Sequence, residues 1–139
     1  MSADRDYSAQ ILAVLEPFDG LVSAYLFGSF AASRAHRESD LDLGVLLDWE
    51  RYPTARQRFE VRLGLIGPLR AATGREPDLV ILNDAPPQLG RHILTAGRRL
   101  MTRNRERDHE QLRITLLRAA DLEPFLRRAR AVKLAALNR

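Results

Sequence analysis

Two acidic residues, Asp40 and Asp42, open the stretch DLDLGVLL, which is otherwise apolar and typical of a buried strand. Because side chains alternate between the two faces of a strand, both carboxylates lie on one face, with Cα atoms about 7 Å apart. Like charges at this spacing repel each other. A divalent cation such as Mg²⁺ or Mn²⁺, which prefers oxygen ligands, removes that conflict. The pair therefore predicts a metal site.

A third acid is expected from the stretch EPDLVIL, which predicts a neighbouring strand. Asp78 opens this strand and is the expected third ligand, with Glu76 as a substitute. A zinc site is not expected. The chain has no cysteine, and its three histidines do not stand at metal-ligand spacing from one another: His36, His92 and His109.

A Gly-Ser pair, Gly28 and Ser29, ends the apolar stretch LVSAYLF and precedes the acids. Glycine lets a ligand approach the backbone closely, and the N–H groups at the start of a helix favour anions. The serine hydroxyl can donate one more hydrogen bond to a phosphate oxygen. A phosphate cradle beside a metal site predicts phosphoryl or nucleotidyl transfer. The sequence G-x-x-x-x-G-K-[ST] is absent, which excludes a P-loop enzyme.

These residues need a sheet to bring them together, and the apolar pattern predicts one. Strands are expected at 21–27, 40–47 and 77–82, with a short edge strand at 98–102. Helices are expected at 5–17, at 54–72 with the apolar stripe Phe59, Leu63 and Ile66, and at 86–97. Residues 104–139 are expected to be helical, with a break or kink near Glu123 because Pro124 follows it. The fold class is α/β (α+β): a small mixed β-sheet with flanking helices, plus C-terminal helices.

Composition narrows the class of protein. The 139 residues, 45% of them hydrophobic, suit one globular domain. The N-terminus lacks the features of a signal peptide and no apolar run is long enough to span a bilayer, so a cytoplasmic protein without a membrane is expected. Residues 98–139 carry seven more basic than acidic side chains, whereas residues 1–97 carry a net charge of about −3. Contact between the basic tail and nucleic acid stays open, as does a homodimer.

The motifs resemble those of a known family. Gly28-Ser29, ten intervening residues and Asp40-Leu41-Asp42 resemble the G-S-x10-D-x-D signature of the DNA polymerase β nucleotidyltransferase superfamily, and the short chain is similar to its minimal nucleotidyltransferase (MNT) branch. The stretch PDLVILND resembles the strand of the third acid. LGRHILTAGRRLMTRN resembles the helix and Gly-x-x-Leu turn that follow it. The resemblance spans about residues 10–105 and implies a nucleotidyltransferase domain at 1–103, followed by a helical extension at 104–139 that packs on the domain or on a partner.

The resemblance also implies roles for these residues. Gly28 and Ser29 hold the phosphates of a nucleoside triphosphate, expected to be ATP, and Asp40 and Asp42 bind Mg²⁺ or Mn²⁺. Asp78 binds the ion beside the acceptor hydroxyl and helps to deprotonate it. One position departs from the family pattern G-S-x-A-R-G, because Ala32 stands where the arginine is common. Arg34, or else Arg37, is the candidate to supply that charge to the nucleotide.

The MNT branch is similar to the antitoxins of HEPN/MNT toxin–antitoxin pairs. That similarity implies a HEPN ribonuclease as the partner and transfer of AMP from ATP to one of its tyrosines. Two alternatives stay open. One is a catalytically weak module that neutralises its partner by contact alone. The other is a ribonuclease, because Arg103 and His109 match the R-x5-H spacing of HEPN nucleases.

Overall fold

The computed structural model describes residues 6–28 and 40–137. Within these residues four strands and four helices alternate in the order predicted from the sequence. The elements and their bounds are α1 (Ser8–Leu15), β1 (Leu21–Phe27), β2 (Leu41–Leu47), α3 (Ala55–Thr73), β3 (Pro77–Ile81), α4 (Pro87–Ala96), β4 (Arg98–Thr102) and α5 (Arg105–Leu137).

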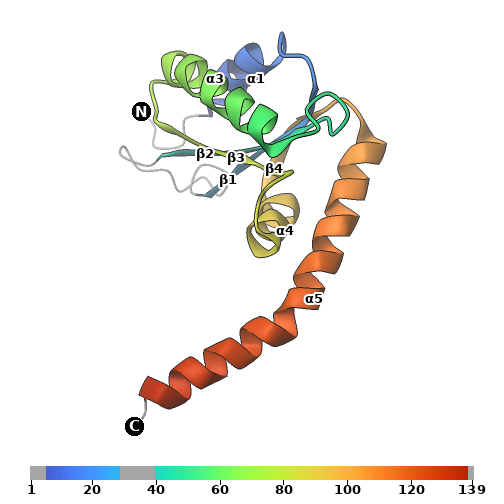
Figure 1. Cartoon of the computed structure of the whole chain (residues 1–139). Helices are drawn as coiled ribbons and strands as arrows, with labels where there is room; N and C mark the ends of the chain where they lie inside the picture. The colour runs from blue at the N-terminus through green and yellow to red at the C-terminus, as the bar shows by residue number, and fades with distance from the viewer. Residues whose placement is uncertain (1–5, 29–39, 138–139) are drawn as a thin grey trace.

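The four strands form one mixed sheet in the order β3-β2-β1-β4. β1 is antiparallel to both of its neighbours, β2 and β4, whereas β2 and β3 run parallel. α1 and α3 cover one face of the sheet, and α4 covers the other (Figure 1). The expected edge strand at 98–102 is confirmed as β4, and β3 forms the opposite edge.

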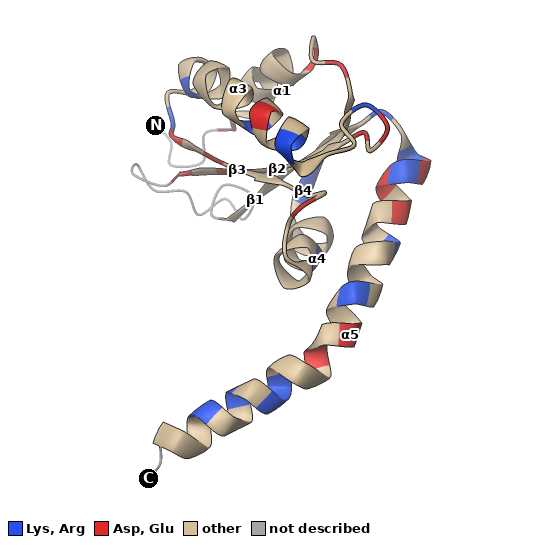
Figure 2. Cartoon of the chain, in the orientation of Figure 1, with Lys and Arg blue, Asp and Glu red and all other residues tan. Residues whose placement is uncertain are grey.

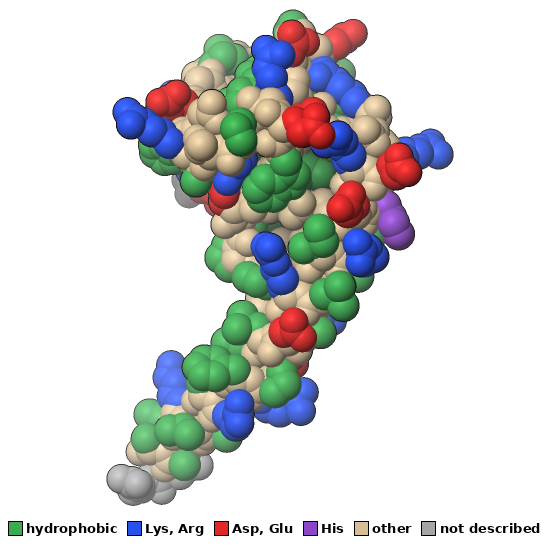
Figure 3. Space-filling view, turned by 45° about the vertical axis from the view of Figure 1, so that its right-hand side comes forward, with side chains coloured by type: hydrophobic (Ala, Val, Ile, Leu, Met, Phe, Trp, Pro, Cys, Tyr) green, Lys and Arg blue, Asp and Glu red, His purple; other side chains and the backbone are tan. Residues whose placement is uncertain are grey.

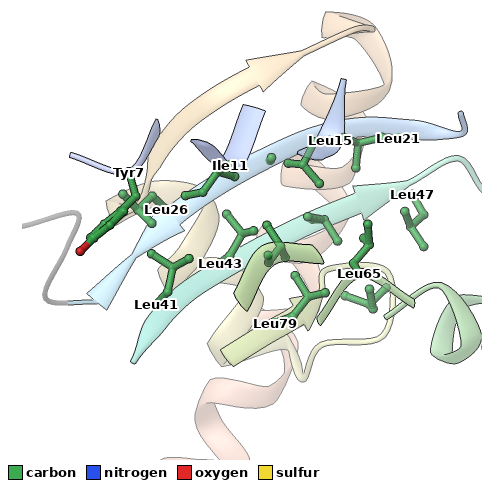
Figure 4. Close-up of a cluster of buried hydrophobic side chains, with 14 residues drawn as sticks. Tyr7, Ile11, Leu15, Leu21, Leu26, Leu41, Leu43, Leu47, Leu65 and Leu79 are labelled. Atoms are coloured by element: carbon green, nitrogen blue, oxygen red, sulfur yellow. The ribbon is translucent and has the colours of Figure 1, made fainter. Parts of the chain in front are cut away.

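The main hydrophobic core lies between the sheet and the helices α1 and α3 (Figure 4). β2 contributes alternate residues to this core, among them Leu41, Leu43 and Val45, each with no exposed surface. A smaller cluster on the opposite face joins Tyr25, Phe27 and Leu46 to Ile93 of α4. Alternation along β2 therefore places the side chain at position 42 on the α4 face, away from the main core.

The helix expected at 54–72 is confirmed as α3, and the face that it buries is not the one that indicates the helix. Thr54 caps the helix in a reciprocal pair of hydrogen bonds with Gln57, and Gly74 ends it at a positive φ of 71°. The stripe that predicts the helix is largely exposed, since Phe59 and Leu63 each keep 52% of their surface accessible. The sheet instead buries the residues one helical face away, with Leu65 and Leu69 at the centre.

The C-terminal region is one helix rather than two. α5 continues through Pro124, which removes one backbone hydrogen bond, and the helix bends midway (Figure 1). Its first half packs on the domain through buried Ala119 and Thr115, and through Asp108, which accepts hydrogen bonds from the hydroxyl of Tyr25 at 2.7 and 2.9 Å. The kink expected near Glu123 is present, and the expected break is not.

The interpretation of Arg103 as part of an R-x5-H nuclease motif is not supported. Its guanidinium donates hydrogen bonds of 2.6 to 3.2 Å to the backbone carbonyls of Leu15, Glu16 and Phe18, at the C-terminal end of α1. Arg103 therefore ties α1 to the sheet, and the mixed sheet around it is not a helical bundle. Among the described residues, no helix combines the length and apolar character that a membrane span requires.

Candidate active site

Three adjacent strands bring the candidate residues to the same end of the sheet. Phe27, the last residue of β1, lies opposite Asp42 of β2, and Asp42 lies opposite Asp78 of β3. Neighbouring strands are about 4.8 Å apart, so the two carboxyl groups share one face at close range. Asp40 precedes β2 and is exposed, as is Asp78, whereas Asp42 is half-buried. The predicted meeting of Asp42 and Asp78 on neighbouring strands is confirmed.

The predicted substitute for the third acid takes another role. Glu76 forms a salt bridge of 2.6 Å with Arg70 on α3. Its backbone carbonyl also accepts a hydrogen bond from the N–H of Leu41, at the start of the parallel pairing. Glu76 thus helps to align β3 with β2, which leaves Asp78 as the acid that faces Asp42.

The electrostatics of the site centre on Asp42. Burial is the largest cause that raises its pKa, to about 6, followed by the negative charges of Asp78 and Asp40. In its protonated form Asp42 also donates a hydrogen bond to Asp78, which raises the pKa further. Burial and the charges of Asp78 and Asp40 therefore disfavour the ionised form of Asp42, and a cation bound beside it would relieve this effect.

Gly28 shapes the space in front of Asp42. It has a positive φ of 72°, a conformation that residues with a side chain rarely adopt. A Cβ atom added there would fall on the carboxylate of Asp42. The glycine therefore keeps the backbone at the end of β1 in direct contact with the acid, and the contact leaves no room for any larger residue.

Gly44 has no side chain, so α4 can pack close to the sheet near the acids. The sequence analysis missed this residue. A Cβ atom at this position would lie 3.0 Å from Cγ2 of Ile93. A glycine inside an apolar strand is the signal that could have indicated this close approach. The close approach packs α4 against β2 two residues along the strand from Asp42.

The donor set suits a divalent cation of the Mg²⁺ class, which binds carboxylate oxygens. Asp42 and Asp78 lie on opposed positions of adjacent strands and interact directly, so the two carboxyl groups are close enough to share an ion. Within residues 6–28 and 40–137, no group of three His, Cys, Asp or Glu side chains is arranged to hold a metal ion. Asp40 therefore acts on Asp42 through its charge in this conformation.

Five positions named in the sequence analysis lie outside the described residues. They are Ser29 of the Gly-Ser pair, Ala32 where the family often has arginine, Arg34 and its alternative Arg37 as expected nucleotide ligands, and His36. Their expected roles stay predictions.

Comparison of the sequence with protein-family models identifies the family of this chain. The model named "Polymerase beta, Nucleotidyltransferase" matches residues 9–106, which include β1 to β4 and the acids at positions 40, 42 and 78. The chain belongs to this nucleotidyltransferase family. A comparison with curated proteins finds no match.

Solved structures share the whole architecture. A toxin–antitoxin structure with AMP-PNP has a TM-score of 0.69 and 25% identity over 95% of this chain and 98% of its own. A structure of the tri-AMPylated Shewanella oneidensis HEPN toxin in complex with MNT antitoxin has a TM-score of 0.63 and 22% identity, over 96% of this chain and 97% of its own. The MntA–HepT toxin–antitoxin structure matches with the same scores. The resemblance to the polymerase beta-like fold and to MNT antitoxins is thereby confirmed.

Proposed function

We propose that this nucleotidyltransferase moves AMP from ATP to a tyrosine hydroxyl of a HEPN ribonuclease toxin and thereby acts as its antitoxin. The observation that carries the proposal is the pair of opposed carboxyl groups, Asp42 and Asp78, on adjacent parallel strands in front of Gly28. The similar structures support it, because one is bound to AMP-PNP and another includes an AMPylated HEPN toxin. A cytoplasmic location and a catalytic unit at residues 1–103 belong to the same proposal.

In this proposal Asp42, Asp78 and Asp40 hold Mg²⁺ or Mn²⁺, which polarises the α-phosphate when bound. Gly28, with Ser29 and Arg34, holds the triphosphate at the end of β1. Asp78 accepts the proton of the acceptor hydroxyl, whose oxygen forms a bond to the α-phosphorus. The bond between the α-phosphorus and the oxygen that bridges to the β-phosphate breaks, and pyrophosphate leaves. Asp78 is exposed on the edge strand β3, where an acceptor can reach it.

The second half of α5 is the proposed partner surface. It extends away from the sheet, and its apolar side chains Phe125, Val132 and Leu137 are 62 to 70% exposed (Figures 1 and 3). Between Pro124 and Leu137 the sequence has four basic residues and no acidic one. Basic residues on this part of the helix are blue in Figure 2. This combination fits a partner surface that is apolar with acidic margins.

The test is transfer of label from α-labelled ATP, with Mg²⁺, to the HEPN-type protein that partners this chain. We expect labelling by the natural protein and a loss of at least about a hundredfold in Asp42→Asn, because a ligand of the cation is removed. The departure at Ala32 favours the alternative of a module that acts by contact alone. That alternative holds if the natural protein and Asp42→Asn label the partner equally poorly while both still bind and inhibit it.

A further inference from the structure

A groove of about 480 Å³ runs along the free edge of the sheet and ends at the candidate active site. It lies between β3, which forms the edge of the sheet in the described part of the chain, and the first half of α3. Asp78 lines one end of the groove, and Ala85 and Pro86 line it in the connection to α4. One of the two opposed acids is thus also part of the groove wall, so a molecule bound at that end of the groove can contact Asp78.

The lining is mainly apolar and is fixed in place. Phe59 on α3 faces the groove with 52% of its surface exposed, and Val80 and Ile81 of β3 form part of the lining. The rims are held by charged groups that are already engaged. Arg58 donates hydrogen bonds of 2.9 and 2.8 Å to Asp84, and the Nε–H of Arg62 donates to the carbonyl of Leu79 at 2.7 Å. Pockets for ligands commonly combine such a preformed apolar lining with a few polar groups.

The strand order gives the site two distinct sides. Gly28 lies at the end of β1, Asp42 on the central β2, and Asp78 on the edge strand β3. In the proposed function the triphosphate lies against Gly28, on the β1 side of Asp42. The acceptor hydroxyl must then approach from the β3 side, where Asp78 is exposed. The groove opens on this side and is continuous with Asp78.

We propose that the groove is the acceptor subsite, and that it binds the apolar segment of the partner protein that carries the reacting aromatic hydroxyl. This inference rests on the proposed function and adds to it the residues that select the acceptor. The ring of Phe59 packs against the segment and Asp78 meets the hydroxyl. The segment is held by side-chain packing rather than as an added strand, because Pro77 lacks an N–H group and Arg62 occupies the carbonyl of Leu79. Phe59 is therefore a positioning residue.

The experiment compares Phe59→Glu with Leu63→Glu in the complete chain. Both residues are 52% exposed and lie on α3, but only Phe59 lines the groove. AMP transfer from α-labelled ATP with Mg²⁺ is measured while the concentration of the HEPN partner is varied. We expect Phe59→Glu to raise the KM for the partner by about tenfold or more, with the KM for ATP unchanged, and Leu63→Glu to change either KM by less than about twofold. Phe59→Leu should restore most of the affinity.

A benzophenone side chain placed at position 59 or 63 gives a readout that does not depend on turnover. With Mg²⁺ and AMP-PNP present, we expect a photochemical crosslink to the partner from position 59 and much less from position 63. Equal crosslinking, or equal KM values for the two glutamate variants, overturns the acceptor subsite while the proposed function stands. Failure of the natural protein to label a partner that it binds overturns the proposed function and, with it, this inference.

Discussion

At the scale of single residues, the raised pKa of Asp42 makes the site a source of instability in the metal-free protein. Its folded-state pKa is about 6, against an ordinary value of 3.8, because it is buried beside Asp78 and Asp40. The folded state therefore binds more protons than the unfolded state between these two pH values. The contribution of Asp42 to stability is present below about pH 4 and is lost as the pH rises through about 6.

This predicts that Asp42→Asn stabilises the protein in the absence of divalent metal. At pH 7 its free energy of unfolding should exceed that of the natural protein by about 1 kcal/mol, a value discounted for the solvent that reaches this half-buried group. The difference should shrink as the pH is lowered to 4. Scanning calorimetry in a chelating buffer measures it, and added Mg²⁺ should raise the Tm of the natural protein more than that of the variant. A less stable Asp42→Asn at pH 7 would contradict the prediction.

Alanine substitutions at Gly28 and Gly74 separate the effect of backbone strain from the effect of disrupting the active site. Both have a positive φ, of 72° and 71°, but a Cβ at Gly74 has open space whereas a Cβ at Gly28 falls on Asp42. Gly74→Ala should cost about 1 kcal/mol of stability and leave AMP transfer unchanged. Gly28→Ala should lower transfer by about a hundredfold or more, because it displaces a ligand of the cation. Urea unfolding and the labelling assay are measured together, and equal activity in the two variants would refute the assignment.

At the scale of elements, Tyr25 and Asp108 hold the first half of α5 on the sheet. Asp108 is buried, and it accepts hydrogen bonds from the hydroxyl of Tyr25 and, at 3.2 Å, from Arg99. Burial and the Asp108 carboxylate raise the pKa of Tyr25, so its hydroxyl keeps the proton that it donates.

Tyr25→Phe should therefore lower the free energy of unfolding by about 1–2 kcal/mol, because a buried carboxylate loses its best donor. Hydrogen exchange should increase in residues 105–119 of α5 and stay unchanged in residues 125–137, which have no contact with the sheet to lose. A loss below about 0.5 kcal/mol would show that Arg99 alone suffices for Asp108.

The elements show what local sequence signals can predict and what they cannot. The bounds expected for α3 agree with the structure because the signals at its ends, the Thr54 cap and Gly74, act within a few residues. The helix α3 has two apolar stripes, and packing against the sheet determines which of them is buried. The stripe that indicates the helix contains Phe59 and Leu63, whereas the sheet buries the stripe with Leu65 and Leu69.

The candidate site, like α3, could be predicted only in part from the sequence. The spacing of Asp40 and Asp42 and the acid at Asp78 indicate the chemistry, because alternation along a strand fixes which carboxylates share a face. The strand order that puts β3 beside β2 is a long-range property, so the opposition of Asp42 and Asp78 needed a family resemblance or a structure. The groove beside Phe59 depends on which face of α3 is exposed, and it could not be predicted for that reason.

At the scale of the whole molecule, the charge of the second half of α5 limits what can cover it. Four basic residues and no acidic one lie between Pro124 and Leu137. The basic residues on two copies of this helix would repel each other, so a second copy of the chain is not expected to cover this surface. Nucleic acid would satisfy the cations but leave the exposed side chains of Phe125 and Val132 without an apolar partner. A protein surface with both apolar and acidic groups can pair with the basic residues and cover the apolar side chains, and we expect such a surface on the proposed HEPN partner.

One side of this helix should therefore carry the contact. Phe125 and Val132 are seven residues apart and lie on one side, whereas Leu134 is 60% exposed on the opposite side. In the background of Asp42→Asn, which prevents transfer, Val132→Glu should raise the Kd for the partner by about tenfold or more, and Leu134→Glu by less than about threefold. Isothermal titration calorimetry measures both. Equal effects of the two variants, or binding of RNA in place of the partner, would reject this surface.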